Sequence, residues 1–230
     1  MDETGGVIST QVIEMFAPEL SRRPPSILYH YTSPEGLHGI VESREIWATN
    51  IHYLNDESEF HHALGIASAE VELAKKKVSN NLDVCVLSQM QEVGLRKDYR
   101  QLFVASFSEK GDLLSQWRAY CPNGGCSIGF VGTALARKDD PTFRLWPCMY
   151  ELESQKETVR NVIEWCLSEF RNAHVCGSNR HRKQRVQQTA NHFRLIMSEV
   201  APLLKHPEFS EEREWRLIGG GQTKNALAFR

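Results

Sequence analysis

The segment Y-H-Y-T at residues 29–32 places four side chains with binding chemistry next to one another. Its aromatic and β-branched residues predict a strand over residues 26–32. Because strand side chains alternate, His30 and Thr32 are expected on one face and Tyr29 and Tyr31 on the other. A histidine beside a hydroxyl group can hold a polar ligand such as a ribose, and a tyrosine can stack on a flat ring. The same pattern equally fits a hydrogen-bonded core histidine with packing tyrosines.

A second polar group follows the apolar segment L-F-V-A-S-F-S at residues 102–108. This segment predicts a buried strand on which Ser106 and Ser108 share a face. Buried hydroxyl groups without partners are costly, which favours a cleft beside them. The guanidinium group of Arg118 offers a bidentate fork for phosphate or carboxylate. In the alternative interpretation, Trp117 and Tyr120 are core residues and Arg118 pairs with an acid.

A third group lies in the alternating segment from Glu211 to Ile218, which predicts a strand. Glu212, Glu214 and Arg216 are expected on one face of that strand. A glutamate there can bind a sugar hydroxyl group or stabilise positive charge. The alternative is an ion-paired ladder on the protein surface.

The spacing of cysteine and histidine in this sequence gives little sign of a metal site. None of the six cysteines forms a C-x-x-C pair or has zinc-finger spacing to histidine, and the nearest pair is Cys121 and Cys126. We interpret them as free thiols. Asp56, Glu57 and Glu59 form the one dense acidic cluster, which is typical of a helix N-terminus. We therefore expect no metal site.

The elements that must position these groups are strands separated by helices of uneven length, which predicts an α+β fold. Residues 1–25 are interpreted as an N-terminal helix and preamble that ends at R-R-P-P, and residues 26–230 as a single domain. The sequence stops within an expected strand at residues 227–230. This leaves open whether a further strand completes the sheet.

The bulk composition excludes several classes of protein. The chain has 230 residues, a formal net charge of −2 and a pI near 6.5, so no global basic field indicates nucleic-acid binding. The basic run at residues 180–185 is interpreted as a solvated helix face, although a nucleic-acid patch stays open. No apolar run reaches the ~20 residues of a membrane span, and the N-terminus lacks a signal pattern. We expect a cytoplasmic protein that binds no membrane.

Several segments together resemble DUF2971, a family of uncharacterised bacterial proteins. The resemblance lies in H-Y-T-S-x-x-G-L-x-x-I at 30–40, L-N-D at 54–56, S-F-S-E at 106–109, S-Q-W-R-A-Y at 115–120, S-I-G-F at 127–130 and E-x-E-W-R-L at 212–217. It covers most of the chain from residue 28 onward. The family label does not by itself give a function.

A looser resemblance connects the strand carrying His-x-Thr, and the short helix after it, to ADP-ribosyltransferase-like proteins. These include DarT toxins and RNA 2'-phosphotransferases. The resemblance implies a mixed, split β-sheet with flanking helices. It also implies NAD as the substrate, with His30, Tyr31, Thr32 and Arg118 binding it. By the same resemblance, Ser106 or Ser108 supplies the middle position, although S-F-S departs from the S-T-S of the arginine-type enzymes.

The late strand of those proteins supplies a catalytic glutamate, which corresponds here to Glu214 or Glu212, with His30 as the further catalytic candidate. The expected function is therefore an NAD-dependent glycosyltransferase that moves ADP-ribose to a nucleic acid or protein. The resemblance further suggests a bacterial toxin or antiphage effector with an antitoxin or defence-system partner. The alternative is a non-enzymatic module that binds a nucleotide or a partner on a degenerate version of the fold. A metal-dependent hydrolytic effector is a third reading, and it would need the acidic cluster at residues 56–59.

Overall fold

The computed structural model describes residues 10–51, 57–95, 102–136, 143–173 and 179–220. The expected strand at residues 227–230 and the L-N-D segment at 54–56 lie outside these ranges. The chain divides into two compact units, each built from three segments. The helical unit comprises Met1–Glu19, Ser58–Tyr99 and Met149–Leu204, and the sheet unit comprises Leu20–Glu57, Arg100–Cys148 and Lys205–Arg230. The single domain expected over residues 26–230 stays a prediction.

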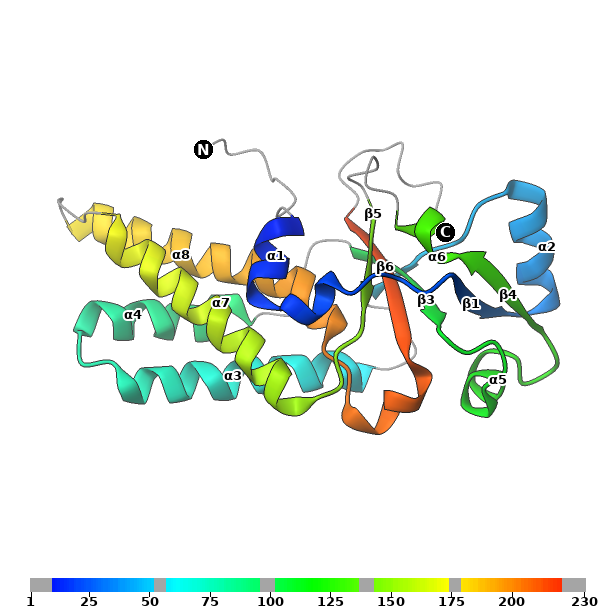
Figure 1. The fold of residues 1–230 in the computed structure, drawn as a ribbon. Helices are drawn as coiled ribbons and strands as arrows, with labels where there is room; N and C mark the ends of the chain where they lie inside the picture. Colours follow the sequence, from blue (N-terminus) through cyan, green and yellow to red (C-terminus); the bar gives the residue numbers. More distant parts are fainter. Residues whose placement is uncertain (1–9, 52–56, 96–101, 137–142, 174–178, 221–230) are drawn as a thin grey trace. The chain divides into compact units, whose positions relative to one another are not determined.

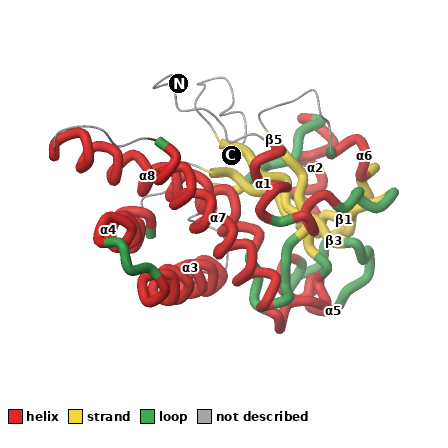
Figure 2. Tube along the Cα trace, turned by 60° about the vertical axis from the view of Figure 1, so that its left-hand side comes forward, coloured by secondary structure: helices red, strands yellow, loops and turns green. Residues whose placement is uncertain are grey.

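The helical unit consists of helices, among which α3, α4, α7 and α8 can be followed in both backbone views (Figures 1 and 2). Its elements are α1 (Thr10–Phe16), α3 (Glu57–Lys77), α4 (Asn81–Gln89), η3 (Met90–Gly94), α7 (Leu152–Asn172), α8 (Asn179–Val200) and η4 (Ala201–Leu203). On α7, Val159, Val162, Ile163 and Cys166 recur at spacings of three and four residues and are buried. This stripe packs against α8.

The sheet unit is built on one sheet of six strands. Its strands are β1 (Ile27–Thr32), β2 (Thr49–Asn50), β3 (Leu102–Ser108), β4 (Cys126–Val131), β5 (Phe143–Pro147) and β6 (Glu214–Gly220). The order is β4-β1-β3-β6-β5, with β2 paired to β3 (Figure 1). The α+β class with flanking helices is therefore confirmed.

The strand pairings differ from the mixed, split sheet that we expected. Every pairing between the described strands is antiparallel, and all six strands belong to one sheet. Antiparallel neighbours accept connections of any length, whereas parallel neighbours need a crossover. The helices of uneven length between the strands are therefore compatible with a fully antiparallel sheet, and the mixed sheet implied by the ADP-ribosyltransferase resemblance is not formed by the described strands.

Short helical elements flank this sheet: η1 (Pro18–Ser21), α2 (Pro34–Ser43), α5 (Leu114–Tyr120), α6 (Gly132–Leu135) and η5 (Pro207–Glu212). Helix α2 begins as its sequence predicts, since Ser33 Oγ accepts a hydrogen bond from the Gly36 N–H at 3.1 Å and Pro34 occupies the first helical position. One sheet face carries the apolar core of the unit, with Leu28, Phe107 and Trp215 almost completely buried.

Candidate functional site

The register of the sheet sorts the sequence-predicted residues onto two faces. Tyr29 pairs with Ser108, and Ser108 pairs with Glu214. Directly opposed residues in a sheet share a face, so these three side chains lie on one side. We call it the Glu214 face: it carries Tyr29, Tyr31, Ser106, Ser108, Glu214 and Arg216. The other side, with Leu28, His30, Phe107 and Trp215, is the Trp215 face.

His30 lies on the Trp215 face, away from Glu214. Its ring centroid is 5.6 Å from that of Phe107. The Nδ1–H of His30 donates to the carbonyl oxygen of Ser106 at 2.9 Å, because a carbonyl group can only accept. Burial lowers the pKa of His30, and the hydrogen bond to Ser106 opposes that shift only in part. His30 is therefore neutral at pH 7 and contacts the backbone of Ser106 rather than the Glu214 face.

Glu214 is the centre of a buried network of charges. It is 5% exposed, and Lys205 and Arg216 are as deeply buried. Lys205 Nζ lies 2.5 Å from Glu214 Oε2, and Arg216 Nε donates to Glu214 Oε1 at 2.8 Å. Lys205 also donates to Glu212 Oε2 at 2.6 Å. We call these four residues the Glu214 network. It is formally neutral, because the positive charges of Lys205 and Arg216 balance the two carboxylates.

The charges around Glu214 decide its ionisation. Burial alone would raise the pKa of Glu214, but Arg216 and then Lys205 outweigh it, and the pKa falls to about 2. Tyr120, the last residue of α5, lies close enough to be affected. Burial of its phenol, followed by the negative charge of Glu214, raises its pKa to about 12. At neutral pH the network thus presents a carboxylate beside a protonated phenol.

The hydroxyl groups on the Glu214 face have different roles. Ser108 Oγ donates to the Glu212 carbonyl oxygen at 2.7 Å and accepts the Lys110 N–H at 3.0 Å. Ser108 therefore fixes the turn that leads into β6. The hydroxyl group of Tyr31 donates to the Lys110 carbonyl oxygen at 2.7 Å, and its ring packs edge-on against Trp117 at 4.9 Å. Both side chains hold the segment between β3 and α5.

The other predicted residues lie in different parts of the sheet unit. Thr32 shares the Trp215 face with His30, and its Oγ1 would lie 2.0 Å from a Cβ placed on Gly36, so it packs closely on α2. Arg118 is exposed on α5. Glu212 belongs to η5 rather than to the strand, although it still reaches Lys205. Asp56 lies outside the described residues.

Sequence reasoning missed Lys205 and the contribution of Tyr120. Lys205 follows the apolar run V-A-P-L-L at residues 200–204, all of it buried. A lysine at the end of a buried run signals that its ammonium group needs a buried acidic partner. Tyr120 was a core residue only in the alternative interpretation, and it is 40% exposed at the rim of the network.

Comparison with known proteins finds a family match over part of the chain and gives no function. The family model described as "Protein of unknown function (DUF2971)" matches residues 116–217. This confirms the resemblance to DUF2971 over that segment, which runs from α5 to β6. The segment includes the whole Glu214 network, whereas His30 and Ser106 precede it. No curated protein and no solved structure matches the chain.

Two further observations concern the described residues alone. No helix among them is both long and apolar enough to cross a membrane. Within the same ranges, no group of three or more histidine, cysteine or acidic side chains is arranged to hold a metal ion. The five cysteines described are free thiols.

Proposed function

We propose that this chain is an ADP-ribosyltransferase-like enzyme that uses NAD to modify a macromolecule. The observation that supports it most is the ionised Glu214 on a strand, next to two cationic side chains and the phenol of Tyr120. The acceptor, a nucleic acid or a protein, and a role as a bacterial toxin or antiphage effector rest on the resemblance alone.

The proposed reaction needs the kind of charge that Glu214 carries. Breaking the bond between nicotinamide and ribose builds positive, oxocarbenium-like charge on the ribose, which a nearby carboxylate stabilises. Nicotinamide leaves with the bonding electrons, the acceptor nucleophile bonds to the ribose carbon, and the acceptor loses its proton. In this proposal Glu214 contacts the ribose, and Arg118 on α5 binds the pyrophosphate through its guanidinium fork.

The proposal changes the role of His30 relative to the sequence-based expectation. Because His30 points to the Trp215 face and donates to Ser106, we assign it to positioning β3 rather than to holding NAD. Tyr29 and Tyr31 share the Glu214 face, so they replace His30 as the aromatic side chains nearest the proposed ribose position. Ser106 shares that face as well.

A non-enzymatic binding module is the second candidate, and one observation favours it. Both carboxylate oxygens of Glu214 already have cationic partners, Arg216 at Oε1 and Lys205 at Oε2. A network satisfied in this way can stabilise a nucleotide-binding fold without any reaction. Binding without turnover would then be the outcome.

The experiment measures turnover and binding on the same preparations. The chain is incubated with NAD labelled in its adenylate half, together with DNA, RNA and a protein extract, and the label on each acceptor is counted. Calorimetry with NAD and with ADP-ribose measures binding separately. Labelling of one acceptor class supports the enzyme, and binding without labelling supports the binding module. If the chain labels no acceptor and binds neither NAD nor ADP-ribose, both candidates are overturned.

Two variants test the residues. Glu214→Gln keeps the size of the side chain and removes its charge, so labelling should fall by about 100-fold. Arg118→Gln lies at an exposed position, so the fold is retained and NAD binding should weaken about tenfold. Glu211→Gln, an exposed glutamate three residues before Glu214, is the matched control and should leave labelling unchanged.

A further inference from the structure

A cavity of about 370 Å³ lies in the helical unit, far along the chain from the Glu214 network. Its lining comes from α3 and from the first turns of α7. The lining residues are His61, His62, Gly65, Ile66, Ala69, Glu70, Leu152 and Lys156. Its volume is that of a site for a small organic molecule.

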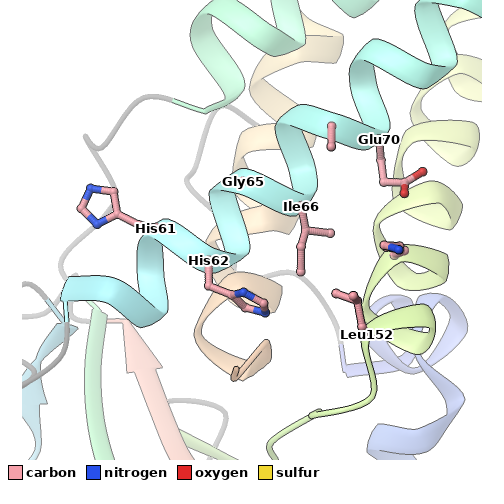
Figure 3. Close-up of a pocket in the computed structure, with 8 residues that line it drawn as sticks. His61, His62, Gly65, Ile66, Glu70 and Leu152 are labelled. Carbon is pink, nitrogen blue, oxygen red and sulfur yellow. The ribbon is translucent and has the colours of Figure 1, made fainter. Parts of the chain in front are cut away.

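Gly65 of α3 forms part of the cavity wall. A Cβ placed on Gly65 would meet no atom within 4 Å, so the space beside it is open. Ile66 and Leu152 face each other across this space, whereas His61 points to the other side of α3 (Figure 3). Leu152 is 39% exposed although it is apolar. The middle of the cavity is thus apolar and accessible.

The wall is held in place by a hydrogen bond between α3 and α7. Gln155 is completely buried, and its Nε2 donates to the Met149 carbonyl oxygen at 2.6 Å. The Gln155 Oε1 must therefore accept the Nε2–H of His62, at 2.9 Å. This arrangement fixes the ring of His62 and with it the cavity beside Ile66.

Opposite charges lie at the polar end of the cavity. Glu70 is 5% exposed, and Arg160 Nε donates to its Oε2 at 2.9 Å. Within the described ranges, Glu70 Oε1 accepts no hydrogen bond. Lys156 donates to Glu153 Oε1 at 2.6 Å, which leaves other ammonium protons available. Figure 3 shows the carboxylate of Glu70 next to α7, on the side where Leu152 lies.

We propose that this cavity binds a small zwitterion with an apolar body, of the class of an apolar α-amino acid. The ligand's ammonium group binds Glu70 Oε1, its carboxylate binds Lys156, and its side chain packs on Ile66 and Leu152 in the space beside Gly65. A buried carboxylate with an unused oxygen, a cation and an apolar wall match these three parts of the ligand.

Calorimetry on the full chain tests the proposal with four probes. L-leucine and L-phenylalanine carry all three groups; N-acetyl-L-leucine lacks the ammonium group; L-leucinamide lacks the carboxylate. Leucine or phenylalanine should bind, and each probe that lacks one charged group should bind at least about tenfold more weakly. Equal binding of all four probes would show that the charges play no role and would overturn the proposal.

Three variants place the ligand in this cavity. Gly65→Leu fills the open space, and leucine is the better helix former, so binding should be lost with no decrease in Tm. Glu70→Gln should weaken the binding of leucine but leave the binding of N-acetyl-leucine unchanged. Lys156→Met should weaken the binding of leucine but leave the binding of leucinamide unchanged. Glu72→Gln, also on α3 but outside the cavity, is the matched control.

Two results would overturn the proposal. One is that neither amino acid binds at millimolar concentration. The other is that Gly65→Leu binds leucine as tightly as the unchanged chain. Neither outcome depends on NAD chemistry, because the cavity and the Glu214 network share no residue.

Discussion

The ammonium nitrogen of Lys205 lies 2.5 Å from Oε2 of Glu214, and the side chains of both residues are about 95% buried. Lys205 begins the third segment of the sheet unit, and Glu214 begins β6 nine residues later. A buried ion pair contributes to stability only while every charge keeps its partner. This pair therefore determines both how β6 is held and how Glu214 is ionised.

Removing Lys205 should destabilise the protein strongly. In Lys205→Met, Glu214 loses the cation at its Oε2 while it stays buried, so the free energy of unfolding should fall by about 3–5 kcal/mol. Denaturant unfolding followed by circular dichroism measures the change. Lys75→Met is the matched control: its pair with Glu72 lies on the surface of α3, so a change of about 0.5 kcal/mol is expected. Equal losses in both variants would contradict the buried network.

Stability should decrease in acid because of Glu214. Its pKa is about 2 in the folded chain and 4.5 as an ordinary glutamate, so the unfolded state binds the proton more readily. The stabilisation, about 3 kcal/mol, is complete above pH 4.5 and is lost as the pH falls toward 2. The difference in unfolding free energy between wild type and Glu214→Gln should shrink between pH 5 and 3. A difference that stays constant over this range would contradict the lowered pKa of Glu214 in the folded chain.

His30 should produce a second pH effect of the same sign. Its pKa is lowered in the folded chain, so the unfolded state takes up the proton first as the pH falls below 6.5. The stabilisation from neutral His30 is complete above pH 6.5 and decreases below it. His30→Gln keeps a donor for the Ser106 carbonyl oxygen, and its unfolding curve should change less between pH 7 and 5.5. NMR titration of the ring gives an independent check; a pKa at or above 6.5 would contradict the buried placement.

Two glycine-to-alanine changes should have opposite effects. A Cβ on Gly132 would lie 2.1 Å from the carbonyl oxygen of Pro25, so Gly132→Ala forces the backbone apart and should cost about 1–3 kcal/mol. A Cβ on Gly65 meets nothing, and alanine favours the helix, so Gly65→Ala should stabilise by up to about 1 kcal/mol. Thermal unfolding of both variants measures the change in stability that each substitution causes. Destabilisation by Gly65→Ala would show that the cavity wall is tighter than described.

Local patterns in the sequence predicted local structure well. The alternation at residues 29–32 placed Tyr29 and Tyr31 on one face and His30 on the other, as the register shows. The pairing of Glu214 and Arg216 on one side of a strand was also correct. Ser33 and Pro34 marked the start of α2 because capping depends on neighbouring residues only.

The candidate site was less predictable because it depends on long-range pairing. Nothing in the sequence says that β3 lies between β1 and β6, or that the register of these strands puts His30 and Glu214 on opposite faces of the sheet. The apolar run before Lys205 signals that its ammonium group needs an acidic partner, but no pattern in the sequence says that this partner is Glu214. Strand β2 is a further example, since its two residues, Thr49 and Asn50, are defined by their pairing with β3 rather than by a local pattern.

The release of nicotinamide from NAD reports the proposed reaction itself, and chromatography at pH 7.5 measures it with nucleic-acid and protein acceptors present. We predict release above the rate without protein, a loss of about 100-fold in Glu214→Gln, and unchanged release in Glu211→Gln. In His30→Gln, release should change far less than in Glu214→Gln, since His30 lies on the opposite sheet face. Absence of release with every acceptor, or equal release by wild type and Glu214→Gln, would contradict the account.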